Sequence, residues 1–153
     1  MVSVDVATLI NMTHDKLPRP AEDIRNEIKR MIPETASSRQ PPESQARVLE
    51  VDEHGTKTYG GELLMDKISL MKDEMKISGV IGLIKIDQRW GYRLVHFPKP
   101  TKLNNEEQKQ GYVIPLNNLT LTPGGVLEEG CYTYITDDPM VSPGATAVFI
   151  LPY

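Results

Sequence analysis

The sequence has few of the residues that hold small folds together. Its one cysteine, Cys131, excludes an internal disulfide framework. Only 6% of the residues are aromatic and 39% are hydrophobic, so the core must come from Val, Ile, Leu and the seven Met. A chain of about this length buries roughly 68–70% of its unfolded surface on folding. The 153 residues therefore predict one domain that needs no disulfide or structural metal.

The sequence also lacks long runs of basic residues and long runs of apolar residues. No block of five or more basic residues occurs, and the net charge is −4, so there is no strong nucleic-acid signal. No run approaches the ~20 apolar residues of a membrane helix, so we expect no transmembrane segment. The first residues lack the basic flank and apolar core of a secretory signal. We therefore expect an intracellular (cytoplasmic) location or a place within a virus particle.

Residues 1–46 form a distinct region that we interpret as an N-terminal arm. Pro20 can begin a helix, Pro33 must end it, and Ile24, Ile28 and Met31 recur at i, i+4 and i+7 between them. A helix of about 12 residues is marginal alone, so this stripe must dock on something. Residues 34–46 have no core residue and predict an extended, Pro-rich linker.

A second helix is predicted over residues 62–77. Its apolar stripe has the helical spacing i, i+4, i+7, i+11 and consists of Leu64, Ile68, Met71 and Met75. Methionine on such a stripe can mark an adaptable partner groove, but core packing is the more common role.

The rest of residues 47–153 favours short strands. Residues 48–51 and 56–59 flank Gly55 and predict a hairpin, and residues 80–86 and 92–97 predict a central one. Further strands are predicted over residues 112–116, 119–122, 131–136 and 145–151, and Pro115 indicates an edge strand. The expected fold is mainly β: a β-sandwich or barrel of about 7–8 short antiparallel strands, with one or two α-helices and an extended N-terminal arm.

No catalytic or metal motif is evident. His14, His54 and His96 lack close-spaced ligand partners, so turn or surface positions are expected for them. Asp137 and Asp138 precede a proline, which is common turn chemistry. We therefore expect no cofactor and no enzymatic activity, and a small hydrolase using Asp137, Asp138 or His96 is the least favoured reading.

The sharpest surface candidate is the tip of the central hairpin. Arg89, Trp90 and Tyr92 are of the types that dominate interface hot spots, although Trp90 is as well suited to capping the core. The stripe Ile24, Ile28 and Met31 of the arm is the second interface candidate.

These patterns favour a non-enzymatic structural protein. The expectation is a β-rich protomer that forms a homo-oligomer or larger symmetric assembly through strand edges and its arm. Capsid, matrix, cement and tail proteins of viruses and phages offer an architectural analogy. The alternative is a protein-binding module that uses residues 89–92.

Overall fold

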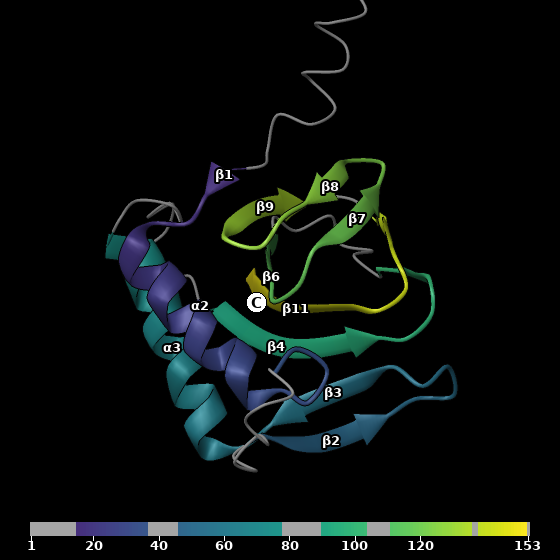
Figure 1. The fold of residues 1–153 in the computed structure, drawn as a ribbon, viewed down its shortest axis with the longest axis horizontal. Helices are drawn as coiled ribbons and strands as arrows, with labels where there is room; N and C mark the ends of the chain where they lie inside the picture. The colour runs from purple at the N-terminus through teal and green to yellow at the C-terminus, as the bar shows by residue number, and fades with distance from the viewer. Residues whose placement is uncertain (1–14, 37–45, 78–89, 104–110, 136–137, 153) are drawn as a thin grey trace, which may run out of the picture.

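The computed structural model describes residues 15–36, 46–77, 90–103, 111–135 and 138–152 (Figure 1). Eleven strands and two helices lie in these ranges, so the mainly β fold is confirmed. The helices are α2 (Arg19–Met31) and α3 (Glu62–Ile77). The strands are β1 (Asp15–Lys16), β2 (Arg47–Val51), β3 (Lys57–Gly60), β4 (Trp90–Phe97), β5 (Thr101–Lys102), β6 (Gly111–Pro115), β7 (Leu119–Thr122), β8 (Gly125–Leu127), β9 (Cys131–Ile135), β10 (Met140–Val141) and β11 (Ala145–Pro152).

The strands form two antiparallel sheets. The larger has seven strands in the order β1-β9-β6-β11-β4-β3-β2, and the smaller has four in the order β5-β10-β7-β8. Helices α2 and α3 pack side by side on one face of the large sheet, and the small sheet covers part of the opposite face (Figure 1). The described part of the chain is thus a three-layer arrangement with a shared central sheet.

Strands β4, β6 and β11 contribute side chains to two hydrophobic cores, one under the helices and one under the small sheet. They can do so because successive side chains of a strand point to opposite faces of the sheet. Leu94 of β4 faces the helices, and the next residue, Val95, faces the small sheet. On β11, Val148 and Phe149 divide in the same way. Strands that are covered on both faces are typically continuous apolar runs, and β6 and β11 come close to this pattern, whereas β4 also contains Arg93 and His96.

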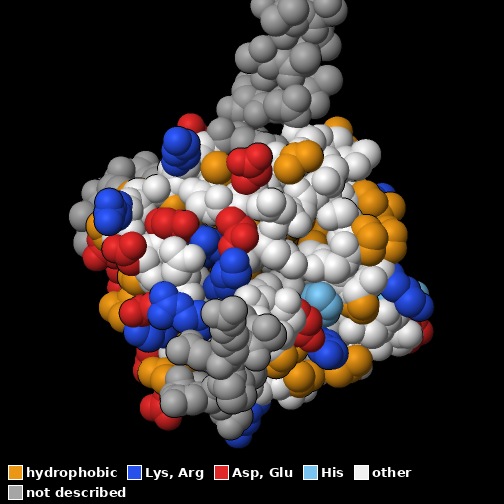
Figure 2. Space-filling view, viewed as in Figure 1, with side chains coloured by type: hydrophobic (Ala, Val, Ile, Leu, Met, Phe, Trp, Pro, Cys, Tyr) orange, Lys and Arg blue, Asp and Glu red, His pale blue; other side chains and the backbone are white. Residues whose placement is uncertain are grey.

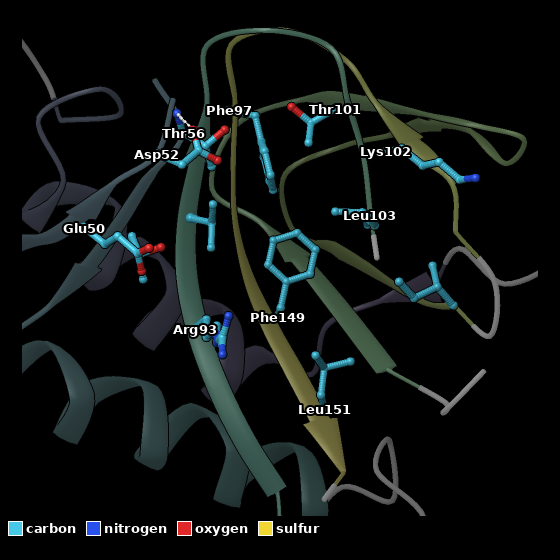
Figure 3. A pocket seen from close by; sticks show the side chains of 13 residues that line it. Glu50, Asp52, Thr56, Arg93, Phe97, Thr101, Lys102, Leu103, Phe149 and Leu151 are labelled. Carbon is cyan, nitrogen blue, oxygen red and sulfur yellow. Dashed lines mark hydrogen bonds between the residues drawn. The ribbon is translucent and has the colours of Figure 1, made fainter. Parts of the chain in front are cut away.

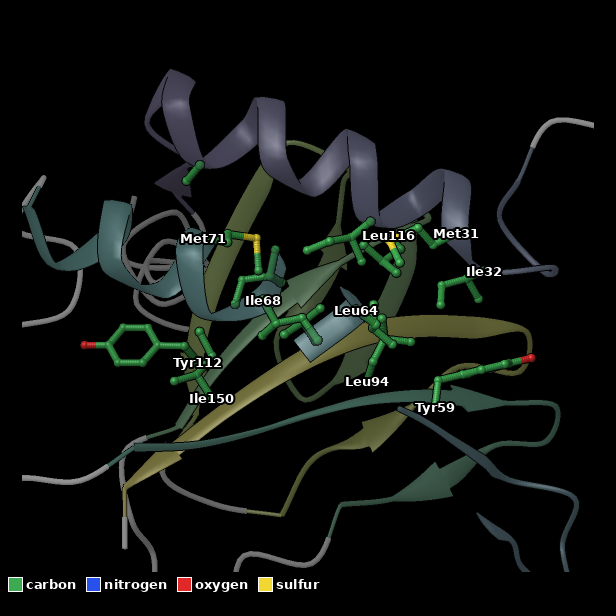
Figure 4. Close-up of a cluster of buried hydrophobic side chains, with 14 of the residues drawn as sticks. Met31, Ile32, Tyr59, Leu64, Ile68, Met71, Leu94, Tyr112, Leu116 and Ile150 are labelled. Carbon is green, nitrogen blue, oxygen red and sulfur yellow. The ribbon is translucent and has the colours of Figure 1, made fainter. Parts of the chain in front are cut away.

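Under the helices, one cluster contains the apolar stripes of both helices together with Tyr59 and Leu116 (Figure 4). The stripe of α3 is fully buried, so core packing is confirmed for Leu64, Ile68, Met71 and Met75. The helix bounds also match the prediction closely, with α2 starting one residue before Pro20 and ending two before Pro33.

Two predictions about pairing fail. The central hairpin was expected to pair residues 80–86 with residues 92–97, but Leu94, Val95 and His96 are paired with β11 on one side and β3 on the other. Residues 80–86 lie outside the described residues. Pro115 does not mark an edge either, because β6 lies between β11 and β9 and Pro115 is its last residue.

Candidate functional site

The interface stripe predicted on the arm helix is part of the chain's own core. Ile28 is fully buried, Met31 is 8% exposed, and Ile24 packs half-buried against the same cluster. Helix α2 therefore docks on α3 and the large sheet of its own chain, and the Ile28 and Met31 side chains are not available on the surface. The division of the chain at residue 46 is untested, but α2 shares a core with residues that follow it.

The interface predicted at residues 89–92 is only partly described. Arg89 lies outside the described residues, and of Trp90 only the backbone, which begins β4, is described. Tyr92 is half-buried against the helix-side core, and the Lys72 ammonium lies 5.3 Å from its ring centroid. Tyr92 thus contacts its own helix layer, and the role of residues 89–92 in binding remains a prediction.

A cluster of ionisable side chains joins the end of α2 to the sheet. The Glu34 carboxylate accepts hydrogen bonds from the Tyr59 hydroxyl and from Lys57 Nζ at 3.1 Å. Burial alone would raise the pKa of Glu34, but these two donors outweigh it and hold the pKa below its usual value. Burial lowers the pKa of His96, whose Nδ1 lies 2.7 Å from Thr146 Oγ1. Each ionisable side chain of this cluster is therefore engaged by another side chain of the fold.

A second cluster fixes α2 to the turn between β8 and β9. Arg25 is only 2% exposed and lies between the carboxylates of Glu22 and Glu129, while Lys29 Nζ also reaches Glu129 at 2.5 Å. Arg25 Nη1 donates to the carbonyl of Pro115 at 3.3 Å as well. Burial would lower the pKa of Arg25, and the two carboxylates reverse this and raise it. The cluster explains how a helix of the predicted arm is held against the sheet.

Neither cluster resembles a metal or catalytic site. Within the described ranges, no group of three or more His, Cys, Asp and Glu side chains is placed to hold a metal ion. Asp138 is half-buried, Asp137 is outside the described residues, and Cys131 packs half-buried against the second core. No described helix is long and apolar enough to cross a membrane. On the face in Figure 2, Lys and Arg side chains alternate with Asp and Glu over α2.

The most exposed apolar strand is β2, at one edge of the large sheet. All five of its residues are exposed, including Val48 at 45%, Leu49 at 60% and Val51 at 55%. Its inner side pairs with β3, with a register irregularity between Val48 and Glu50. Its outer side has no strand partner among the described residues. The hairpin predicted around Gly55 included β2, but the sequence did not indicate that this strand lies at an edge.

A pocket of about 360 Å³ opens beside this edge, on the sheet face away from the helices. Figure 3 shows Phe97 and Phe149 in its centre, Arg93 at one end, and Thr101 to Leu103 along one side. The lining residues are Glu50, Asp52, Thr56, Thr58, Arg93, Val95, Phe97, Thr101, Lys102, Leu103, Ile135, Phe149 and Leu151. His96 and Asp138, the candidate hydrolase residues, are not among them.

Sequence reasoning missed this pocket because six separate strands contribute to it, together with the β2–β3 connection and the residue after β5. The alternation of Arg93, Val95 and Phe97 on one face of β4 was the only available signal, and it does not show what faces them. Comparison with known proteins adds no assignment: no protein-family model matches the chain, and no curated protein matches it either.

Proposed function

We propose that the chain is a non-enzymatic structural protein whose protomers associate through the edge strand β2. The observation that supports this most strongly is the run of three exposed apolar side chains, Val48, Leu49 and Val51, on that edge. An exposed apolar edge strand is a template for pairing with another chain, and soluble proteins normally blunt such edges. Keeping one is therefore more consistent with assembly than with a solitary protomer.

The other sheet edges are blunted. Strands β1 and β5 have two residues each, and β1 consists of Asp15 and Lys16, both exposed. Strand β8 has three residues, of which only Val126 is a large exposed hydrophobic. Short or charged edges resist strand addition. The contrast within one molecule indicates that β2 is the edge available for pairing.

A second copy of the chain is the occupant that β2 fits best. The strand begins at Arg47 and ends next to Asp52, with Glu50 between, so its first end is basic and its last end acidic. Antiparallel self-pairing places the basic end of one copy against the acidic end of the other and brings the apolar centres together. Such a contact is isologous and produces closed two-fold pairs, which can serve as units of a larger assembly.

The bulge at Leu49 shortens the ladder that a second copy can form. Irregular edges pair less extensively than flat ones. We therefore expect β2 pairing to be weak and concentration-dependent, and further contacts would be needed to complete a shell or fibre. Architecture of this kind is analogous to capsid, matrix, cement and tail proteins, and a location in the cytoplasm or a virus particle is part of the same proposal.

Sedimentation velocity over a wide range of protein concentrations tests the proposal. The weight-average mass should rise towards a defined multiple of the protomer mass. Val51→Lys should shift that rise to at least tenfold higher concentration, since it places a positive charge on the apolar edge, at the end of β2 that faces the basic Arg47 end of the other copy. Leu70→Lys is the matched control, because Leu70 is 53% exposed on α3 and lies away from the edge. A strictly monomeric chain at millimolar concentration, or equal effects of the two variants, would overturn the proposal.

A further inference from the structure

The pocket beside β2 has an apolar floor and a polar border. Val95, Phe97, Ile135, Phe149 and Leu151 supply apolar side chains, and the two Phe rings meet edge to face with centroids 5.9 Å apart. Small-molecule sites typically combine such a floor with a few polar groups in a volume of roughly 300–1,000 Å³. At about 360 Å³, this pocket is at the lower end of that range.

Two cations at the border have no partner in the described part of the chain. The side chains of Arg93 and Lys102 make no ion pair or hydrogen bond with another described residue, whereas those of Lys29, Lys57 and Lys67 all do. Arg93 lies at one end of the pocket beside Leu151, and Lys102 lies on the side formed by β5 (Figure 3). An unpaired guanidinium next to apolar surface favours an anionic group, above all a carboxylate, which it can bind through two hydrogen bonds.

The acidic lining residues do not reverse this preference. Asp52 Oδ1 accepts hydrogen bonds from the backbone N–H groups of His54 and Thr56, at 2.8 Å and 3.0 Å, so this carboxylate is committed to the β2–β3 turn. Glu50 is on the exposed strand β2, so its carboxylate can be solvated by water and does not need a partner inside the pocket. The Asp52 carboxylate therefore already has partners, whereas the Arg93 and Lys102 side chains have none among the described residues and are free to bind a ligand.

A buried hydroxyl, that of Thr56, lies at the end of the pocket opposite Arg93. Thr56 Oγ1 is buried and is the one described side-chain oxygen or nitrogen of this kind without a hydrogen-bond partner. Buried polar atoms are normally paired, so an unpaired one that lines a pocket points to a bound group or an ordered water. The register of β3 with β4 places Thr56 near Phe97, four residues from Arg93 along the strand, or about 13 Å at 3.3 Å per residue.

We infer that this pocket binds a small amphipathic carboxylate. The carboxylate pairs with Arg93, Lys102 adds longer-range attraction, and the apolar chain lies over Phe149 and Phe97 towards Thr56. A group at the far end of the ligand that accepts a hydrogen bond would satisfy the Thr56 hydroxyl. This site does not depend on self-association through β2, because the residues that contact the ligand lie on β4, β5 and β11 and, for Thr56, directly before β3.

Binding of decanoate, followed by heteronuclear NMR and calorimetry below its micellar concentration, tests the inference. Decanol and decyltrimethylammonium share the chain length and replace the anion with a neutral or cationic head. Decanoate should bind at one site per chain and at least fivefold more tightly than either, with the largest shifts on β4 and β11. Equal affinity for all three probes, or no binding of decanoate, would overturn the inference.

Two substitutions locate the contacts. Arg93→Gln should weaken decanoate binding about tenfold, the usual effect of losing a charge-assisted hydrogen-bond pair at a partly exposed site. Arg30→Gln, an exposed cation on α2, is the matched control and should leave the affinity unchanged. Equal effects of the two variants on decanoate affinity would mean that only the net charge of the protein matters, and would overturn the assignment of Arg93 as the carboxylate partner.

Thr56→Val tests the buried hydroxyl separately. Valine has nearly the same shape, so removal of an unpaired polar atom should leave the melting temperature of the free chain unchanged or higher. The affinity for 10-hydroxydecanoate, which has a hydrogen-bonding group at the far end, should fall while that for decanoate does not. Loss of stability on this substitution would show that the hydroxyl is paired inside the protein and would overturn its assignment to the ligand.

Discussion

Replacing Ile28 by alanine should destabilise the isolated protomer strongly. Ile28 is fully buried between α2, α3 and the sheet, and the change removes three carbon atoms from that contact. At about 0.8 kcal/mol per buried methylene the transfer loss is about 2.4 kcal/mol. The cavity left behind raises the expected cost to about 3 kcal/mol, within the usual range of roughly 2–5 kcal/mol for such changes.

The matched control is Leu70→Ala on α3. Leu70 is 53% exposed, so the same kind of truncation should change the free energy of unfolding by less than about 0.5 kcal/mol. Urea denaturation measures both variants, and the melting temperature of Ile28→Ala should fall by roughly 6–12 °C, since a domain of this size loses about 2–4 °C per kcal/mol.

Protein concentration separates a core role of Ile28 from an interface role. A core residue costs the same stability at every concentration, whereas an interface residue costs more as the oligomer becomes populated. A loss below about 1 kcal/mol, or a loss that depends on protein concentration, would refute the placement of Ile28 in the protomer core.

Three further substitutions test the polar contacts. Arg25→Met should cost about 2 kcal/mol in urea denaturation, because it removes charged hydrogen bonds from two carboxylates, and a loss no larger than that of Arg30→Met would contradict this. The pKa of Glu34 is lower in the folded chain than in the unfolded chain, so the stability that its carboxylate contributes is complete above the unfolded pKa and is lost as the pH falls through the folded pKa. Glu34→Gln should flatten this acid limb of the stability profile, and an unchanged limb would exclude Glu34 as its source. Gly130 has φ +86° and a Cβ there would lie 3.2 Å from Glu22, so Gly130→Ala should cost about 1–2 kcal/mol in thermal unfolding, and a neutral result would contradict that strain.

Local periodicity was enough to predict the helices and the first hairpin. The spacing of Leu64 to Met75 gave the buried face of α3, and Gly55, with φ +83°, closes the β2–β3 hairpin as expected. These features depend on neighbours within one or two turns of chain. Sequence alone determines them because the side chains that meet are close in the chain.

Pairing across long separations could not be predicted in the same way. Strand β4 pairs with β11, about 50 residues later, and nothing in the apolar run of β4 distinguishes that partner from an adjacent strand. The missing N–H of Pro115 predicts an edge strand, but Pro115 is the last residue of β6, where the pairing with β9 has already ended at Val113, so no donor is needed there. Its carbonyl instead accepts from Arg25, a contact across 90 residues.

The exposed edge and the pocket have one structural origin. The small sheet packs over β9, β6, β11 and β4, and the helices cover the other face as far as Tyr59 of β3, while β2 lies beyond both layers (Figure 1). Where the small sheet stops, the face of β4 next to the hairpin is open, and this opening is the pocket. Because the central sheet is wider than the layer that covers it, the same uncovered margin provides an unpaired strand and a half-open apolar site. Glu50 belongs to both, since it lies on β2 and lines the pocket.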